Sequence, residues 1–201
     1  MMLPFMKYQQ IRFVFPLLFL SLLILSSCQA PAPYPRPMAF HRIDFPQEVA
    51  YTQFESSACP FTFEYPDMGG ITRSNSDSCW VDIYYPQYEC TWHITYRDIQ
   101  TSGKSRAKHF EEWRKLIYQH SKKASQIKEN PIQAENGKGF IFEVFGEVGT
   151  PAQIFFFDEQ EEDLMMMSIY FQSALKNDSL APVIEYMKEE LAHLTTTMEW
   201  K

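Results

Sequence analysis

Two short segments of the chain are apolar at almost every position. Residues 153–158 contain three consecutive phenylalanines, and residues 164–171 contain three consecutive methionines. Both segments have the length of strands, and a strand without polar alternation needs cover on both faces. Neighbouring methionines on a strand point to opposite faces, which favours a core role over a copper site. We therefore expect a sheet with a helix packed on each side.

Four further segments carry strand patterns, with apolar side chains at alternate positions or in short runs. These are residues 59–65, 79–85, 88–97 and 139–147. The second and third flank Pro86-Gln87, which predicts a hairpin with a two-residue turn. In that register Val81 lies opposite Trp92, and the apolar residues of both strands fall on one side.

Two segments have the apolar spacing of helices. Across residues 105–128, apolar side chains recur at intervals of three and four, and Pro131 is expected to follow the end of the helix. A second helix is predicted from Asp178, which can cap its first turn, to near the C-terminus. The predicted fold is α+β, with order βββ-α-βββ-α: a mostly antiparallel sheet of about six strands with two packed helices.

The N-terminal segment has the pattern of a bacterial lipoprotein signal. Two basic residues precede an apolar stretch of 13 residues, 13–25, which is short for a membrane span. It ends in Leu-Ser-Ser-Cys at residues 25–28, so residues 1–27 are predicted to be removed and Cys28 to carry lipid, including fatty acids such as palmitate. The alternative is a plain signal peptide or an anchor helix, although Pro16 would disturb a spanning helix. Gln29, in place of Asp, favours the outer membrane with the domain facing the periplasm.

Prolines occupy every second position from residue 31 to residue 37, which favours a polyproline II conformation. Residues 28–45 are therefore predicted to be the lipid anchor and a stiff tether, and residues 46–201 a single α+β domain. A sharper alternative is that the tether docks on its own domain or on a partner. The docking residues would be Tyr34, Pro35, Arg36 and Pro37.

The charge of the mature chain excludes one class of partner. Removing residues 1–27 from 201 leaves 174 residues with 16 basic and 25 acidic side chains, a formal charge of −9. A surface this acidic argues against non-specific binding to nucleic acid or to anionic lipid.

Three cysteines remain after Cys28, an odd number that cannot all pair within one chain. If residues 59–65 pair with 79–85, Cys59 lies at the far end from Cys79, and in the predicted hairpin Cys79 and Cys90 lie several residues apart. A disulfide needs Cα atoms within about 7 Å. Buried free thiols are therefore favoured, with one bridge as the alternative that an oxidising periplasm permits.

The chain lacks the sequence motifs of common catalytic and metal sites: it has no HExxH, CxxC, GxSxG or P-loop. The five histidines have no metal-ligand spacing. His120 lies on the apolar side of the predicted helix, where a core or rim histidine is favoured over a catalytic base. His93 is expected to pack against Trp80, and the acidic run at residues 158–163 to form a hairpin turn. We expect no enzymatic activity, no cofactor and no metal.

Several short sequences, in this order, give the mature chain a resemblance to a known family. They are Tyr34-Pro35-Arg36-Pro37, His41-Arg42-Ile43-Asp44-Phe45-Pro46, Phe61-Thr62-Phe63-Glu64-Tyr65, Trp80, Ile83-Tyr84-Tyr85-Pro86-Gln87-Tyr88, His120-Ser121-Lys122-Lys123-Ala124, Pro151-Ala152-Gln153-Ile154-Phe155-Phe156, Asn177-Asp178-Ser179-Leu180-Ala181-Pro182-Val183-Ile184 and Glu199-Trp200-Lys201. The set resembles the gliding-motility lipoproteins of the GldD type. The strand and helix order also resembles the Mog1/PsbP sandwich.

The resemblance implies a cell-envelope lipoprotein that supports gliding on surfaces and the type IX secretion apparatus, with other envelope lipoproteins as partners. The expected role is an assembly or interaction module. The alternative is a periplasmic lipoprotein that binds a small ligand or peptidoglycan without a motor role. A pocket that joins Arg36, His41 and His120 would favour the alternative, whereas a flat aromatic patch would favour the interaction module.

Overall fold

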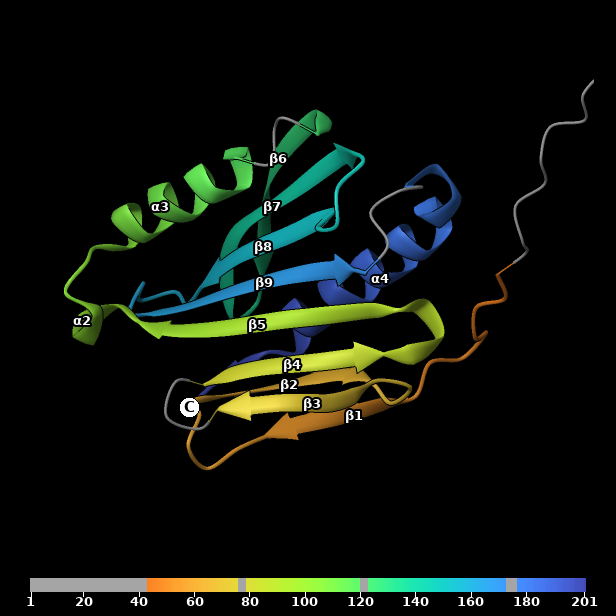
Figure 1. The fold of residues 1–201 in the computed structure, drawn as a ribbon. Coiled ribbons are helices and arrows are strands. Elements are labelled where there is room, and N and C mark those ends of the chain that lie inside the picture. The colour runs from red at the N-terminus through yellow and green to blue at the C-terminus, as the bar shows by residue number, and fades with distance from the viewer. Residues whose placement is uncertain (1–42, 76–78, 120–122, 173–176) are drawn as a thin grey trace, which may run out of the picture. The chain divides into compact units, whose positions relative to one another are not determined.

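The computed structural model describes residues 43–75, 79–119, 123–172 and 177–201. Seven antiparallel strands of this part form one sheet in the order β3-β4-β5-β9-β8-β7-β6 (Figure 1). Their bounds are β3 Gly70–Asn75, β4 Trp80–Tyr85, β5 Cys90–Asp98, β6 Ala124–Ala134, β7 Gly137–Gly146, β8 Ala152–Phe157 and β9 Asp163–Phe171. A smaller sheet has the order β1-β2-β10, with β1 Tyr51–Glu55, β2 Phe61–Pro66 and β10 Glu199–Trp200.

Helices lie on both faces of the large sheet. The helices are α2 Ile99–Ser102, α3 Arg106–Gln119 and α4 Asn177–Thr197. In β8, Ile154 and Phe156 belong to the core that includes α4, whereas the intervening Phe155 and Phe157 pack in a second cluster with Trp113 of α3. Because alternate side chains of a strand point to opposite faces, α3 and α4 cover opposite sides of β8. The two-sided burial predicted for the apolar segments is thus confirmed.

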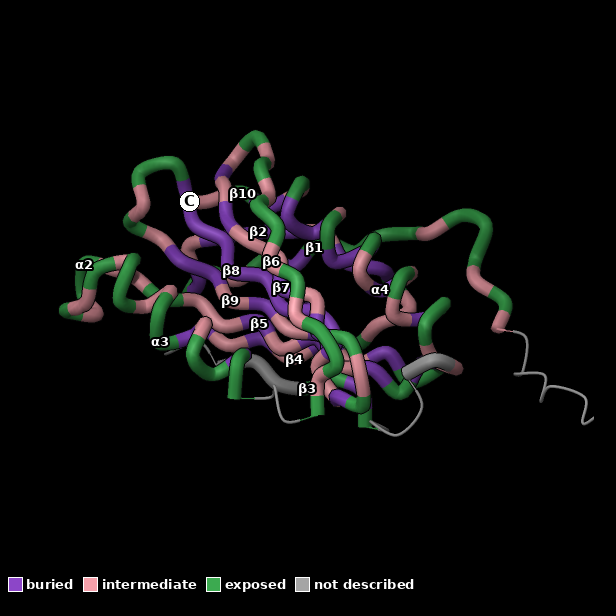
Figure 2. The backbone as a smooth tube through the Cα atoms, turned by 90° about the horizontal axis from the view of Figure 1, so that it is seen from above, coloured by how far each residue is buried: buried purple, intermediate pink, exposed green. Residues whose placement is uncertain are grey.

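The burial of the strands follows their position in the sheet. All six residues of β8 are buried, whereas none of the eleven residues of the edge strand β6 is fully buried (Figure 2). The core on the α4 side also receives the smaller sheet and, at the start of the described chain, Ile43 and Phe45. The ring centroid of Phe45 lies 4.8 Å from that of Tyr186.

The α+β class, the antiparallel sheet and the final helix agree with the sequence prediction, but the first helix is shorter than predicted. It ends at Gln119, and Ala124–Ala134 is strand β6. Ala124 and Ile127 pack on the cluster beneath α3. The two residues that the helical spacing predicted to face the core are therefore partly buried, although they lie on an edge strand. Pro131 is tolerated in β6 because this strand lies at the edge of the sheet. Proline has no backbone N–H, and an edge strand does not need a hydrogen-bond donor on its outer side.

The predicted hairpin forms, with a different register. Its turn is not two residues long: Pro86–Tyr88 is a short 3-10 helix, and Glu89 adopts a left-handed backbone with φ of 47°. Tyr85 therefore pairs with Cys90, and Val81 pairs with Ile94 in place of Trp92. The shift is an even number of residues, so every side chain stays on the predicted face.

The expectation of free thiols at Cys59 and Cys79 is wrong. These residues form a disulfide, with their Cα atoms 5.5 Å apart. The prediction had placed residues 59–65 beside residues 79–85, but β2 belongs to the smaller sheet and its partners are β1 and β10. The bridge therefore joins the segments that lead into β2 and β4, one in each sheet. Cys90 is a buried free thiol.

Candidate functional site

The residues singled out from the sequence for lipidation or binding lie outside the described part of the chain. They are Cys28, Tyr34, Pro35, Arg36, Pro37, His41 and His120. No helix among the described residues is long and apolar enough to cross a membrane. Nor do the described residues contain a group of three His, Cys, Asp or Glu side chains that could hold a metal ion.

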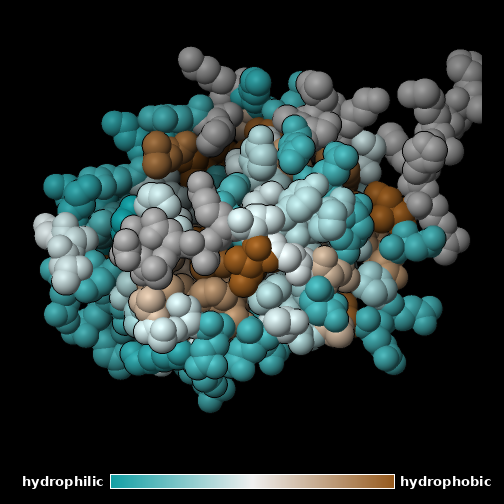
Figure 3. All heavy atoms as spheres, turned by 60° about the horizontal axis from the view of Figure 1, so that its bottom comes forward, coloured by the Kyte–Doolittle hydropathy of each residue, from teal (hydrophilic) through white to brown (hydrophobic). Residues whose placement is uncertain are grey.

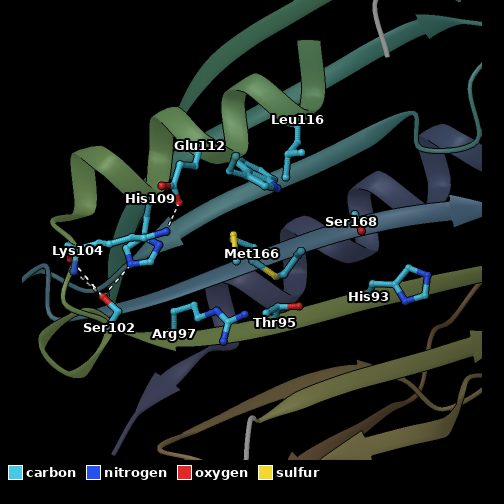
Figure 4. A pocket seen from close by; sticks show the side chains of 12 residues that line it. His93, Thr95, Arg97, Ser102, Lys104, His109, Glu112, Leu116, Met166 and Ser168 are labelled. Carbon is cyan, nitrogen blue, oxygen red and sulfur yellow. Dashed lines mark hydrogen bonds and ion pairs between the residues drawn. The ribbon is translucent and has the colours of Figure 1, made fainter. Parts of the chain in front are cut away.

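A cleft of about 550 Å³ lies where α3 meets the uncovered part of the large sheet (Figure 4). Helix α3 packs on β7, β8 and the start of β9, and its side toward β5 forms one wall of the cleft. On this sheet face the side chains of β4 and β5 are half-exposed, including Tyr84, Thr91 and His93. The cleft is lined by His93, Thr95, Arg97, Ser102, Lys104, His109, Glu112, Trp113, Leu116, Met166, Met167 and Ser168.

The helical wall of the cleft comes from one side of α3. His109, Glu112 and Leu116 are three and four residues apart, so they follow one another along the same helix side. Trp113 is buried beneath them, with its ring centroid 5.4 Å from that of Phe155. Leu116 is 56% exposed, the most exposed large hydrophobic side chain among the described residues.

The short connection from β5 through α2 to α3 places the polar residues at one end of the cleft close together. Strand β5 runs into the single-turn helix α2, where the Asp98 carboxylate accepts a hydrogen bond from the Thr101 backbone N–H and its pKa is thereby lowered. Gly103 follows with a φ of +67°, a conformation that favours glycine. The turn places Ser102 and Lys104 beside α3.

Ser102 and His109 form a hydrogen-bonded pair at the polar end of the cleft. The Ser102 Oγ lies 2.8 Å from His109 Nε2 and 2.8 Å from the Ile99 carbonyl oxygen. It also accepts a hydrogen bond from the Lys104 backbone N–H at 3.2 Å. Burial and the nearby Lys104 lower the pKa of His109. The pair therefore fixes the position of the α2–α3 connection.

The sheet wall carries Arg97 and His93 on β5. The Arg97 guanidinium lies over the Trp80 ring, 5.6 Å from its centroid. His93 does not pack on Trp80 as predicted, because Trp80 pairs with Thr95 in the observed register. The His93 Nδ1 instead lies 2.8 Å from the Asp82 carboxylate.

The acidic run after β8 forms the predicted turn, but one of its members is buried. The Asp158 carboxylate accepts hydrogen bonds from the backbone N–H groups of Gln160, Glu162 and Asp163, at 2.8 to 3.1 Å. Its role is to close the connection between β8 and β9. The methionine run lies in β9, where Met165 and Met167 face the α4 core and Met166 faces the cleft.

Figure 3 brings the side of β1 and β3 forward and shows hydrophobic residues among hydrophilic ones. The sequence pattern predicts only a packed His93 and places Leu116 on the apolar face of the helix, and it does not point to Arg97 or Lys104 as site residues. The available signal was the spacing of His109, Glu112 and Leu116, which places them along one helix side.

A family model described as "Gliding motility lipoprotein GldD" matches residues 30–200 of the chain. A search of curated proteins finds no match. Among solved structures, the chain is similar to a cyanobacterial PsbP (CyanoP) from Synechocystis sp. PCC 6803, solved in solution. That similarity has 8% sequence identity and a TM-score of 0.43, and it covers 80% of this chain and 98% of the other.

Proposed function

Because the chain belongs to the family of GldD gliding-motility lipoproteins, we propose that it supports gliding and the type IX secretion apparatus as an assembly or interaction module. The observation that carries the proposal is the family match, which extends over nearly the whole chain after the signal segment. The module has no reaction of its own in this proposal.

The proposal includes a lipid anchor at Cys28, after cleavage by the lipoprotein peptidase, and an outer-membrane location facing the periplasm. Three observations support it: the Leu-Ser-Ser-Cys sequence at residues 25–28, Gln29 in place of Asp, and a family match that begins at residue 30. The Cys59–Cys79 disulfide is consistent with an oxidising compartment such as the periplasm.

The surface proposed for partner binding is the cleft together with the uncovered sheet face beside it. Leu116 and Tyr170 are 56% and 39% exposed, so each leaves apolar area in water that a partner would cover. Tyr170 lies on β9 and its ring centroid is 5.9 Å from that of His93.

A second candidate function is the binding of a small ligand or of peptidoglycan in the periplasm. The observation that favours it is the convergence of polar groups from β5, the α2–α3 connection and α3 on one concave site.

Photo-crosslinking in intact cells tests the first proposal. A photoreactive amino acid replaces Tyr34 in the tether or Tyr170 on the sheet face, and an exposed residue of the smaller sheet, Glu55, serves as the control position. We expect envelope components of the gliding and secretion apparatus to be captured from Tyr34 and Tyr170 and identified by mass spectrometry. Recovery of no such component from either position, or of peptidoglycan fragments alone, would contradict the proposal.

A further inference from the structure

The cleft beside α3 has the opposite charge to the protein that contains it. The whole chain has a formal charge of −7. Two cationic side chains, Arg97 and Lys104, line the cleft against one carboxylate, Glu112. With the histidines counted as neutral, the cleft carries one positive charge. A local reversal of charge on an acidic surface favours an anionic group in the bound partner.

The unpaired cation is Arg97. The Nζ of Lys104 lies 2.6 Å from a Glu112 carboxylate oxygen, so these two charges satisfy each other, and Lys104 holds the pKa of Glu112 below its ordinary range. Among the described residues Arg97 has no carboxylate partner, and its contact with Trp80 is through the ring face. A guanidinium in this state keeps its planar set of N–H donors for a bidentate acceptor.

Apolar side chains adjoin this cation. Leu116 projects from α3 into the cleft, and Met166 lies across from it on β9 (Figure 4). Trp113 also lines the cleft. An apolar group placed here would remove the exposed apolar surface of Leu116 from water, which favours binding.

We propose that the cleft binds a carboxylate carried next to an apolar side chain, as at the C-terminus of a partner protein that ends in an apolar residue. The carboxylate lies against Arg97, and the side chain packs on Leu116, Met166 and Trp113. This inference rests on the proposed function and deepens it, because it names the chemical group that the interaction module binds in its partner.

The charge count favours a carboxylate over a phosphate. A carboxylate brings one negative charge, which matches the one unpaired cation, whereas a phosphate brings up to two. The volume of about 550 Å³ also suits one or two amino-acid residues and lies within the range of small-ligand sites.

Nuclear magnetic resonance of the full lipidated chain in detergent micelles tests the proposal. Labelling with 15N-tryptophan gives four indole signals, one for each tryptophan. Trp113 lines the cleft, and Trp200 lies in β10 of the smaller sheet, where it reports on the integrity of the fold. The probes are N-acetyl-phenylalanine, which has a free carboxylate, and N-acetyl-phenylalanine amide, which is the same molecule without the charge.

We expect N-acetyl-phenylalanine to shift the Trp113 signal in a saturable way and to leave the Trp200 signal in place. The amide is expected to bind at least about tenfold more weakly, because a charge-assisted bidentate contact is lost. Arg97→Gln is expected to weaken the acid by about the same factor and to leave binding of the amide unchanged. Lys115→Gln makes the same charge change on α3 but outside the cleft, so it should leave both affinities within about twofold.

Equal affinity for acid and amide, an unchanged affinity in Arg97→Gln, or no Trp113 shift at the highest soluble probe concentration would each overturn the assignment. The crosslinking result remains separate from this one. Captured gliding components together with a failed probe titration would leave the interaction module in place and remove the carboxylate cleft from it.

Discussion

The disulfide between Cys59 and Cys79 gives the most quantitative test of the fold. The bridge joins residues 20 positions apart, so it restricts the unfolded chain by closing a loop of that size. The loop-closure relation for 20 residues gives an entropy loss of about 11 cal/mol/K in the unfolded state, or about 3 kcal/mol at 25 °C. Reduction of the bridge should therefore lower the free energy of unfolding by about 3 kcal/mol and the melting temperature by about 6–12 °C.

The assay is urea unfolding, followed by tryptophan fluorescence, of the protein with and without a thiol reductant. The oxidised and reduced proteins have the same side chains, so the difference isolates the bridge. The double variant Cys59→Ala/Cys79→Ala should match or fall below the reduced protein. Cys90→Ala is the control for losing a buried sulfur without a crosslink, and its stability should not depend on the reductant.

Two results would refute the reasoning. One is an oxidised protein no more stable than the reduced protein. The other is a thiol titration in urea without reductant that finds Cys59, Cys79 and Cys90 all reactive. The expected titration finds one reactive thiol among these three.

Three further predictions concern single residues. Burial raises the pKa of the Cys90 thiol, so an alkylating reagent should modify it in urea and not in the folded protein, as read by mass spectrometry. Phe156→Ala should lower the free energy of unfolding by about 3–5 kcal/mol, measured by urea unfolding, because the ring is fully buried; a loss below about 1 kcal/mol would contradict its core position. The pKa of His109 is lowered from 6.5, so the unfolded chain binds more protons just below that pH and stability should rise with pH through this window; His109→Gln should flatten the rise, and an unchanged slope would exclude His109 as its source.

The elements with the strongest local patterns were predictable from the sequence. Continuous apolar runs predicted that β8 and β9 are buried on both faces. An apolar stripe at helical spacing, preceded by a capping residue, predicted α4. Strand β1 left no such signal, because one of its five residues is buried. Only the first residues of β6, 124–128, were predicted to be helical, because Ala124 and Ile127 are three residues apart and fit both a helix face and a half-buried edge strand.

The disulfide and the cleft were not predicted from the sequence because both depend on how distant segments of the chain are arranged relative to one another. No local sequence pattern predicts that β2 pairs with β1 and β10. The position of β2 in the smaller sheet determines which cysteines lie close enough to form a disulfide. The cleft likewise depends on the turn at Gly103, which carries Lys104 from the end of β5 toward α3. The charges of its walls are visible in the sequence, but their convergence depends on that turn.

We propose that this lipoprotein acts in gliding through the surface formed by the cleft and the adjoining sheet face. The most direct measurement is colony spreading and protein secretion by a gliding strain whose only copy carries Leu116→Glu and Tyr170→Glu. Tyr118→Glu, at an exposed aromatic residue of α3 outside the cleft, is the control, and unchanged urea midpoints establish that each variant is folded. We expect loss of spreading and secretion in the double variant and normal spreading and secretion in the control. Normal spreading and secretion in a folded double variant would contradict it.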